Sequence, residues 1–354
     1  MNRLTGDSNL LTFSISCLLT ALLVGCGGGG GGTNSPRSAV LSSGVMTKGS
    51  VILNGVHFDD SAATITCSGE SKTPAFLQTG MVVEVRGLRN KDGLTGTAQQ
   101  VNVLTEVRGV IQSINNSTPP FSFVVIGQTV LLDDSTVFEP GAASPLDALN
   151  SVVPGETRVE AFGLRDAAGA IHATLARLVT DATVQDEVRG TASNLNVGQS
   201  FSLQPGNVGI DITGASVLPQ GATLAEGASV QVLGTFDQNS ETFFASQVIV
   251  EDVQNVAFHP HKGRHHGKGK HGKNHDKEGN HEEDENELEG FVTGCTDSPC
   301  GNGVFFVNGQ AVELSDGTRF EDGSFGDLAE GSRVEIEGNS FDGDVLVAGK
   351  IEFK

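Results

Sequence analysis

The chain has 354 residues and a formal net charge of −21 at neutral pH, and it contains 47 glycines and 19 phenylalanines but no tryptophan or tyrosine. A negative surface repels a phosphate backbone, so we expect no nucleic-acid partner. Glycine at this frequency, with Val, Leu, Ala and Phe and turn residues every few positions, is typical of an all-β protein with short strands. The length suffices for two or more domains.

Residues 1–25 are predicted to be an export signal. One basic residue, Arg3, precedes a mostly apolar stretch at residues 10–24 that is too short to span a bilayer as a helix. The stretch runs into Leu-Val-Gly-Cys at residues 23–26, which resembles the lipobox of bacterial lipoproteins. This resemblance implies that the Cys26 thiol is joined to diacylglycerol, that the bond before it is cut, and that the new amine is acylated.

Residues 26–44 are predicted to be a flexible, lipid-anchored linker. Six further glycines follow Cys26, and the next four residues are Thr-Asn-Ser-Pro, so no side chains there could build a core. Several acyl chains anchor a protein stably, where one chain alone is marginal. We therefore expect a membrane partner through Cys26 and a location in the bacterial cell envelope. Gly27, in place of an aspartate, implies the outer membrane by resemblance to the sorting pattern of enteric bacteria.

Export places the remaining cysteines where disulfides persist. Cys295 and Cys300 flank Thr-Asp-Ser-Pro in a glycine-bounded loop, and this spacing lets their Cα atoms approach to about 5 to 6 Å across a turn. We predict one loop-closing disulfide between them. Half of a metal site is the competing interpretation, but nothing supplies a second cysteine pair. The odd thiol, Cys67, is expected to be buried in a strand rather than reactive.

Four segments of the chain repeat the same order of predicted strands, glycines and turns. Each opens with a strand that carries a glycine marking a bend or bulge, namely Gly49, Gly109, Gly190 or Gly290. A central pair of short strands follows around Gly55, Gly127, Gly209 or Gly309. The clearest signal is an alternating strand between two glycines, at residues 80–87, 155–163, 227–234 and 331–338. A polar turn and a last strand complete each copy.

Closure of such a module into a barrel removes the edges that an open sheet would expose. Its pattern, Gly-x-x-Val-x-Val-x-Gly followed by a turn and Ala-x-x-Ile or Val, resembles a bacterial domain-of-unknown-function family of small barrels akin to the OB-fold, repeated in tandem on lipoproteins. The resemblance implies an all-β fold of four tandem five- to six-stranded OB-like β-barrels, but no activity. Four unrelated meanders are the alternative. The predicted barrels occupy residues 45–104, 105–182, 183–253 and 287–354.

Residues 254–286 separate the third barrel from the fourth and are expected to be disordered. Between His259 and His281 no apolar residue occurs, so this stretch cannot build a core. The stretch is rich in Lys and His, and an acidic block from Glu282 to Glu289 follows it. We expect the two halves to attract one another, more tightly when the histidines become charged near about pH 6.

Neutral imidazole is a common ligand of Zn, Cu and Ni. A flexible tract can wrap several rings around one ion, although with modest affinity because no rigid surroundings orient them. The histidine-rich stretch is therefore either a weak binding segment for Zn, Cu or Ni or a soluble spacer without a binding role. Calorimetry with Zn²⁺ or Cu²⁺, with and without residues 259–281, separates these two interpretations. The candidate ligands are His259, His261, His265, His266, His271, His275 and His281.

No motif predicts an enzyme. A lipase-like Gly-Asp-Ser-Asn-Leu at residues 6–10 lies in the segment that export removes. His57 and His172 stand outside the histidine-rich stretch, each in an expected strand and without a matched nucleophile motif. Acidic turns such as Asp316-Gly317 lack the ligand order of an EF-hand and fit hairpin chemistry better.

The sequence therefore predicts a non-catalytic, membrane-anchored envelope lipoprotein without an obligatory cofactor. Its barrel array would bind or space an unidentified envelope protein or ligand, since serial modules create surface without an active site. Metal capture by the histidine-rich stretch is the alternative function. Sugar or oligonucleotide binding on OB-like faces is less favoured, because aromatic platforms usually carry it. The oligomeric state is left open.

Overall fold

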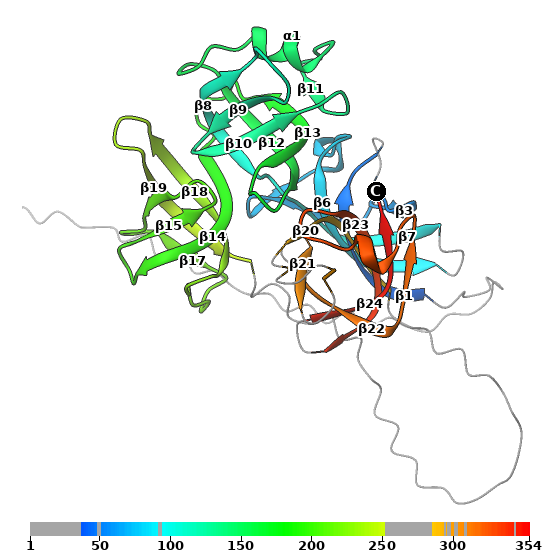
Figure 1. Cartoon of the computed structure of the whole chain (residues 1–354). Helices are drawn as coiled ribbons and strands as arrows, with labels where there is room; N and C mark the ends of the chain where they lie inside the picture. The colour runs from blue at the N-terminus through cyan, green and yellow to red at the C-terminus, as the bar shows by residue number, and fades with distance from the viewer. Residues whose placement is uncertain are drawn as a thin grey trace, which may run out of the picture. The chain divides into compact units, whose positions relative to one another are not determined.

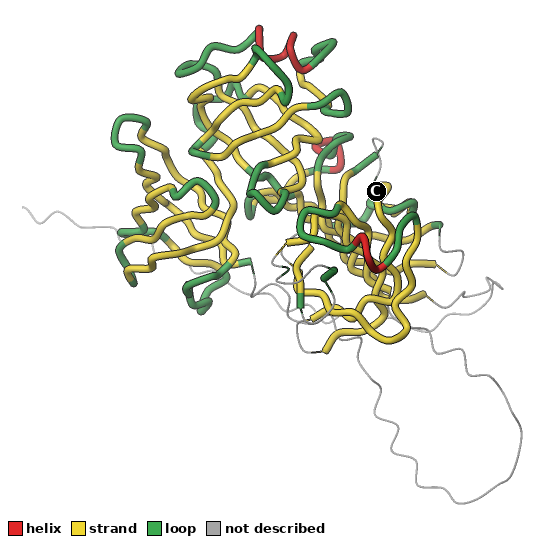
Figure 2. Tube along the Cα trace, in the orientation of Figure 1, coloured by secondary structure: helices red, strands yellow, loops and turns green. Residues whose placement is uncertain are grey.

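The computed structural model is built almost wholly of strands (Figures 1 and 2). Its described part contains one α-helix and two 3-10 turns. The residues that the structure describes are 37–47, 51–90, 94–251, 285–293, 295, 299–300, 304–307, 310–342 and 345–354.

The second barrel shows the topology that the four barrels share. It comprises β8 (Val107–Asn115), β9 (Phe121–Val125), β10 (Gln128–Leu132), β11 (Val137–Glu139), α1 (Pro145–Asn150), β12 (Arg158–Arg165) and β13 (Ile171–Leu178). Antiparallel pairing joins β8 to β9, β9 to β10, β12 to β13 and β12 to β8, while β10 and β13 run parallel. The ring order is therefore β8, β9, β10, β13, β12 and β8 again. When the short β11 is left out of the count, this is first, second, third, fifth, fourth and first again, as in an OB-fold. The fourth and fifth strands of each barrel are named in this sense.

The third and fourth barrels repeat this ring, and the first has the same order of strands. The first comprises β1 (Arg37–Val45), β2 (Ile52–Leu53), β3 (Val56–Asp59), β4 (Thr64–Cys67), β5 (Glu70–Lys72), β6 (Val82–Asn90) and β7 (Thr95–Val103). No pairing of β1 with β2 occurs among the described residues of the first barrel. The third comprises β14 (Asp186–Asn196), β15 (Ser200–Gln204), β16 (Val208–Asp211), β17 (Ser216–Leu218), β18 (Ser229–Asp237) and β19 (Thr242–Val250). The fourth comprises β20 (Glu285–Thr293), β21 (Phe305–Val307), β22 (Gln310–Glu321), β23 (Arg333–Asp342) and β24 (Val345–Phe353). The predicted all-β fold of four small barrels is thus confirmed.

Apolar side chains fill the barrels. Phe58, Phe243 and Phe305 are fully buried in the first, third and fourth barrels. Phe162 belongs to the second barrel but packs into the core cluster of the first. Neighbouring barrels are therefore joined by apolar burial as well as by polar contacts.

The leading glycine of the Gly-x-x-Val-x-Val-x-Gly pattern has the same role in every barrel. Gly80, Gly155, Gly227 and Gly331 all have φ between +82° and +88°, a region that favours glycine. Each of their N–H groups donates to a carbonyl within or directly after its barrel's first strand, at 2.8–2.9 Å. These acceptors are Met46, Ile111, Ala192 and Val292.

The closing glycine of the same pattern marks a β-bulge. The register between the fourth and fifth strands shifts at Gly87, Gly163, Gly234 and Gly338. A Cβ atom there would lie 2.1–2.6 Å from a backbone oxygen of the fifth strand. We expected the bulge at the opening glycine instead. The pairing of Gly109, Gly190 and Gly290 with the fourth strand is continuous, so that expectation is corrected.

Two predicted boundaries are also corrected. Residues 37–44, assigned to the linker, belong to β1, which pairs along its whole length with β6. Gly44, opposite Val83, is therefore the opening glycine of the first barrel, not Gly49. At the other boundary, β20 begins at Glu285, so part of the acidic block is strand. Gly209 lies within β16, and the turn before it is Gly206-Asn207, both with positive φ.

The barrels are joined through their first strands. Antiparallel pairing of β8 with β14 links the second barrel to the third, with Arg108 opposite Glu187. Parallel pairing of β1 with β20 links the first barrel to the fourth, with Val40 opposite Glu285. Each junction produces a continuous 12-stranded sheet. Barrels that are far apart in the sequence thus share one sheet.

Candidate functional site

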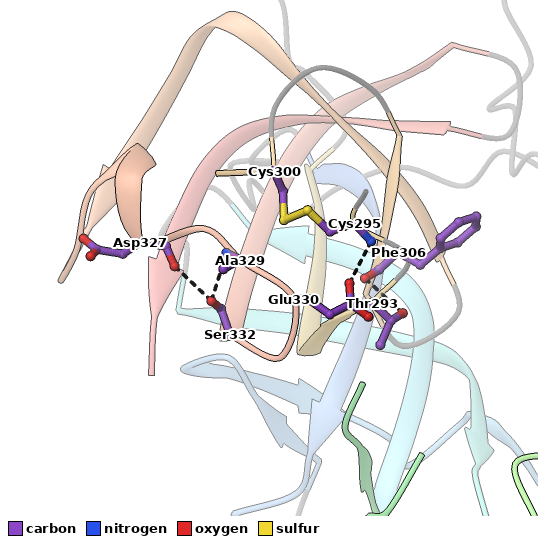
Figure 3. Close-up of a disulfide and its surroundings, with 8 residues drawn as sticks. All are labelled: Thr293, Cys295, Cys300, Phe306, Asp327, Ala329, Glu330 and Ser332. Atoms are coloured by element: carbon purple, nitrogen blue, oxygen red, sulfur yellow. Dashed lines mark hydrogen bonds between the residues drawn. A yellow bond between two sulfur atoms is a disulfide. The ribbon is translucent and has the colours of Figure 1, made fainter. Parts of the chain in front are cut away.

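The disulfide loop lies between the first and second strands of the fourth barrel (Figure 3). Cys295 and Cys300 are joined, with their Cα atoms 5.6 Å apart. Cys300 is buried in the barrel core, and its N–H donates to the Leu328 carbonyl at 2.7 Å. The N–H of Cys295 donates to the Glu330 carboxylate at 2.7 Å. These contacts fasten the loop to the segment before β23, which indicates a structural role.

A cluster of buried charges lies where three barrels meet. Arg108 of the second barrel forms ion pairs of 2.7 Å with both Glu160 and Glu187. All three side chains are at most 8% exposed. Glu160 also pairs with Arg177 at 2.6 Å. Charges removed from water are stable only when paired and hydrogen-bonded, and among the described residues no buried side-chain nitrogen or oxygen lacks a partner.

Aromatic rings extend this cluster toward the first barrel. The Arg177 guanidinium lies 5.0 Å from the ring centroid of Phe76 in the first barrel and 5.3 Å from that of Phe162 in the second. Lys72 lies 5.5 Å from the Phe76 ring. A guanidinium held between two rings gains cation–π attraction while remaining paired with Glu160. The same side chain therefore links barrel packing to charge neutralisation.

A second group of charges surrounds Arg189 of the third barrel. Its guanidinium forms a two-bond contact with Glu251, at 2.7 and 2.8 Å, and also pairs with Glu106 at 3.2 Å. Glu106 is paired with Arg165 as well, at 2.9 Å. These carboxylates raise the pKa of Arg189 although burial alone would lower it. Arg189 therefore remains charged at every physiological pH.

A polar cavity of about 420 Å³ adjoins Arg189. Its lining includes two complete ion pairs, Arg189 with Glu251 and Arg86 with Glu84 at 3.0 Å, so charged side chains there balance. The rest of the wall is mixed. It contains the apolar side chains of Leu41, Leu104, Ile249 and Leu288, together with hydrogen-bonding side chains of the first, third and fourth barrels, among them Thr64, Thr66, Gln100, Asn102, Ser229, Gln231 and Gln310. Such a lining suits a polar ligand without net charge, because it offers both donors and acceptors.

A larger cavity, of about 810 Å³, lies beside the Arg108 cluster. Cys67, Lys72 and Arg177 contribute to its wall, together with the connection from the second barrel to the third. Cys67 is buried in β4, as expected, and its sulfur lies 3.7 Å from the hydroxyls of Ser68 and Thr105. Burial raises the pKa of the Cys67 thiol, as do the charges of Glu187 and Glu160. A neutral thiol is a poor nucleophile.

Several predicted site residues lie outside the part of the chain that the structure describes. These are the lipidation site Cys26 and the seven candidate metal ligands, His259, His261, His265, His266, His271, His275 and His281. Within the described ranges, no group of three or more potential metal ligands occurs. None of the described helices is long and apolar enough to cross a membrane.

The two histidines outside that stretch lie in strands. His57 is exposed in β3, whereas His172 in β13 is partly buried. The His172 Nε2 atom lies 3.0 Å from the Asp166 carboxylate, and its ring centroid is 4.8 Å from that of Phe291. These residues include no nucleophile. The ring contact joins the second barrel to the fourth.

The charged cluster and the polar cavity are not predicted by the sequence. Glu106, Arg108, Glu187 and Arg189 stand around the opening glycines, where alternation marks outward-facing positions of a strand. A charged residue on the outer face of one barrel becomes buried only when another barrel covers it. The repeated Val-Arg-Gly of residues 107–109 and 188–190 is the one local signal.

Three segments of the chain match the family described as "Domain of unknown function (DUF5666)", at residues 40–102, 108–175 and 289–352. They correspond to the first, second and fourth barrels and together cover more than half of the chain. The third barrel has the same ring of strands without such a match. No curated protein matches the chain.

Proposed function

Because the chain belongs to the family described as "Domain of unknown function (DUF5666)", we propose that it is a non-catalytic lipoprotein of the bacterial envelope whose joined barrels form a binding scaffold. The polar cavity between the first, third and fourth barrels is the observation that carries the binding part of this proposal. Packing of the first barrel against the fourth favours binding over spacing, because a spacer would gain most from barrels arranged in a line.

The balanced charges of the cavity indicate the kind of ligand. Both cations in its wall, Arg86 and Arg189, have carboxylate partners, so an anion would have to compete with Glu84 and Glu251. Hydroxyl and amide groups, such as those of Thr64 and Gln100, line much of the remaining wall beside four apolar side chains. We therefore propose a neutral, polar small molecule or a polar loop of an envelope protein as the occupant.

Filling the cavity tests this assignment. Gln100→Trp places an indole on an exposed, cavity-lining position of β7, and we expect loss of whatever the full-length protein captures from solubilised native membranes. Gln99→Trp is the matched control, because Gln99 is the exposed residue beside it and does not line the cavity. Mass spectrometry of the captured material provides the comparison. Equal capture by both variants would place the binding surface elsewhere.

The lipid anchor requires a separate test. Cys26→Ser removes the thiol that would carry diacylglycerol, so we expect an unprocessed, unlipidated precursor in cells. Cys17→Ser, within the predicted signal, should mature as the unaltered protein does. Intact mass and incorporation of labelled palmitate measure both variants. Normal maturation of the Cys26→Ser protein would remove the lipoprotein assignment while leaving the cavity test unaffected.

A further inference from the structure

Glu187 receives hydrogen bonds from three different barrels. Its side chain, on β14 of the third barrel, has no exposed surface. Its Oε2 atom accepts from the Ser68 hydroxyl of the first barrel at 2.6 Å and pairs with Arg108 of the second barrel at 2.7 Å. Its Oε1 atom accepts from the Gln231 amide of the third barrel. One carboxyl group therefore lies at the junction of three barrels.

The surrounding charges leave Glu187 less well compensated than its neighbour Glu160. Arg108 is shared by the two carboxylates, and Glu160 has Arg177 as a second cation. The other charges around the site are already paired, with Glu106 bound by Arg165 and Arg189, Arg189 also bound by Glu251, and Glu70 bound by Lys72. Two carboxylates that share one guanidinium in a buried place disfavour full ionisation of both.

The partners of Glu187 suit either protonation state. A serine hydroxyl can donate or accept, and a glutamine amide offers an acceptor oxygen beside its donor nitrogen. Ser68 or Gln231 can therefore accept a hydrogen bond from a protonated Glu187 after a local rotation. Arg108, which only donates, retains Glu160 and the Gln185 carbonyl as acceptors, the latter at 2.8 Å.

We propose that Glu187 is a proton-binding site that couples the packing of the first three barrels to pH. The packed state takes up one proton on this carboxyl, while a separated, hydrated Glu187 releases it to solvent. Mild acidity thus tightens the junction. The proton comes from and returns to water, so no other reactant is involved.

The environment of the Glu187 carboxyl decides whether acidity stabilises or destabilises the packed state. Burial, together with the charge of Glu160, raises the pKa of Glu187 above its ordinary value of 4.5 although Arg108, Ser68 and Gln231 lower it. A raised pKa in the folded state contributes stability that is complete below the unfolded value and is lost as pH rises through the folded value. The aspartates Asp59, Asp181 and Asp237 have lowered pKa values, because they accept hydrogen bonds, and their protonation weakens the fold only at lower pH. The two effects therefore occupy different pH ranges.

Urea unfolding of the full-length protein, followed by far-ultraviolet circular dichroism from pH 8 to pH 5, tests the proposal. We expect the unfolding equilibrium constant of the unaltered protein to fall with acidity, by at most about tenfold per pH unit for one linked proton. Glu187→Gln cannot take up this proton. A plot of its unfolding equilibrium constant against pH should therefore have a smaller slope than that of the unaltered protein. Glu156→Gln, at an exposed position of the second barrel, should retain the slope in full. The histidines titrate in both proteins, so subtracting the pH dependence of the Glu187→Gln variant from that of the unaltered protein removes their contribution to stability.

A direct measurement covers the case in which Glu187→Gln fails to fold. Infrared difference spectra of the unaltered protein between pH 8 and pH 5 should show the carbonyl stretch of a buried, protonated carboxyl group, and Glu156→Gln should leave that band in place. Equal slopes for the unaltered protein and a folded Glu187→Gln would overturn the proposal. So would the absence of the protonated-carboxyl band above pH 5.

Discussion

Arg108→Met is expected to lower the free energy of unfolding by about 3–5 kcal/mol at pH 8, the usual loss when one partner of a buried ion pair is removed. Methionine keeps an unbranched apolar stem but leaves the fully buried Glu187 carboxylate without its cation. Glu160 would keep Arg177. The loss should shrink as pH falls, because a protonated Glu187 no longer needs a positive partner.

Lys72→Met provides the matched control for Arg108→Met. Lys72 also pairs with a glutamate, Glu70, but that carboxylate is 74% exposed, and an exposed pair contributes about 0–1 kcal/mol. Urea unfolding of both variants and of the unaltered protein measures the difference. Similar losses for the two substitutions would mean that the Arg108 cluster does not stabilise the barrel junction.

Gly234→Ala is expected to destabilise the third barrel by about 3 kcal/mol or more, because overpacking against backbone cannot be relieved by rotating a side chain. The added Cβ atom would lie 2.1 Å from the carbonyl oxygen of Phe244, and Ala245 closes the other side at 3.0 Å. The bulge between β18 and β19 would have to open, and with it the closure of the barrel.

Gly209→Ala separates this clash from the general effect of replacing a strand glycine. Gly209 lies in β16 of the same barrel, and no atom lies within 4 Å of its added Cβ. Loss of backbone freedom in the unfolded chain should leave that variant as stable as the original or slightly more so. Circular dichroism and urea midpoints provide the comparison. Equal stability of the two variants would mean that the bulge glycine is not required.

Local pattern was sufficient to predict the barrels. Alternation between two glycines marks the fourth strand, since the first glycine needs a positive φ and the second needs room for a neighbouring carbonyl. The short spacing of Cys295 and Cys300 is likewise a local property, and the two sulfurs are joined in the structure. Such features depend on residues that are near in sequence, which is why the sequence alone contains them.

The first strand and the barrel junctions could not be predicted in this way. The segment that forms β1 contains Ser42 and Ser43, which are buried, and it follows a glycine-rich stretch, so it resembles linker by composition. Only its pairing with β6 and β20 identifies it as a strand. Glu187 similarly has the local pattern of an exposed residue, because burial there depends on contacts from Ser68, 119 positions away. Long-range packing leaves no periodic signal.

The pairing of β1 with β20 affects the order in which the barrels can fold during synthesis. A polypeptide made from its N-terminus can close the second and third barrels as soon as their own strands have emerged, because each ring uses neighbouring residues. The partner strand of β1, in contrast, begins 245 positions further on, at Glu285 opposite Val40. Until those last residues appear, β1 presents an unpaired edge of the kind that recruits foreign strands. Protection of the nascent first barrel by a chaperone would therefore matter most before synthesis ends.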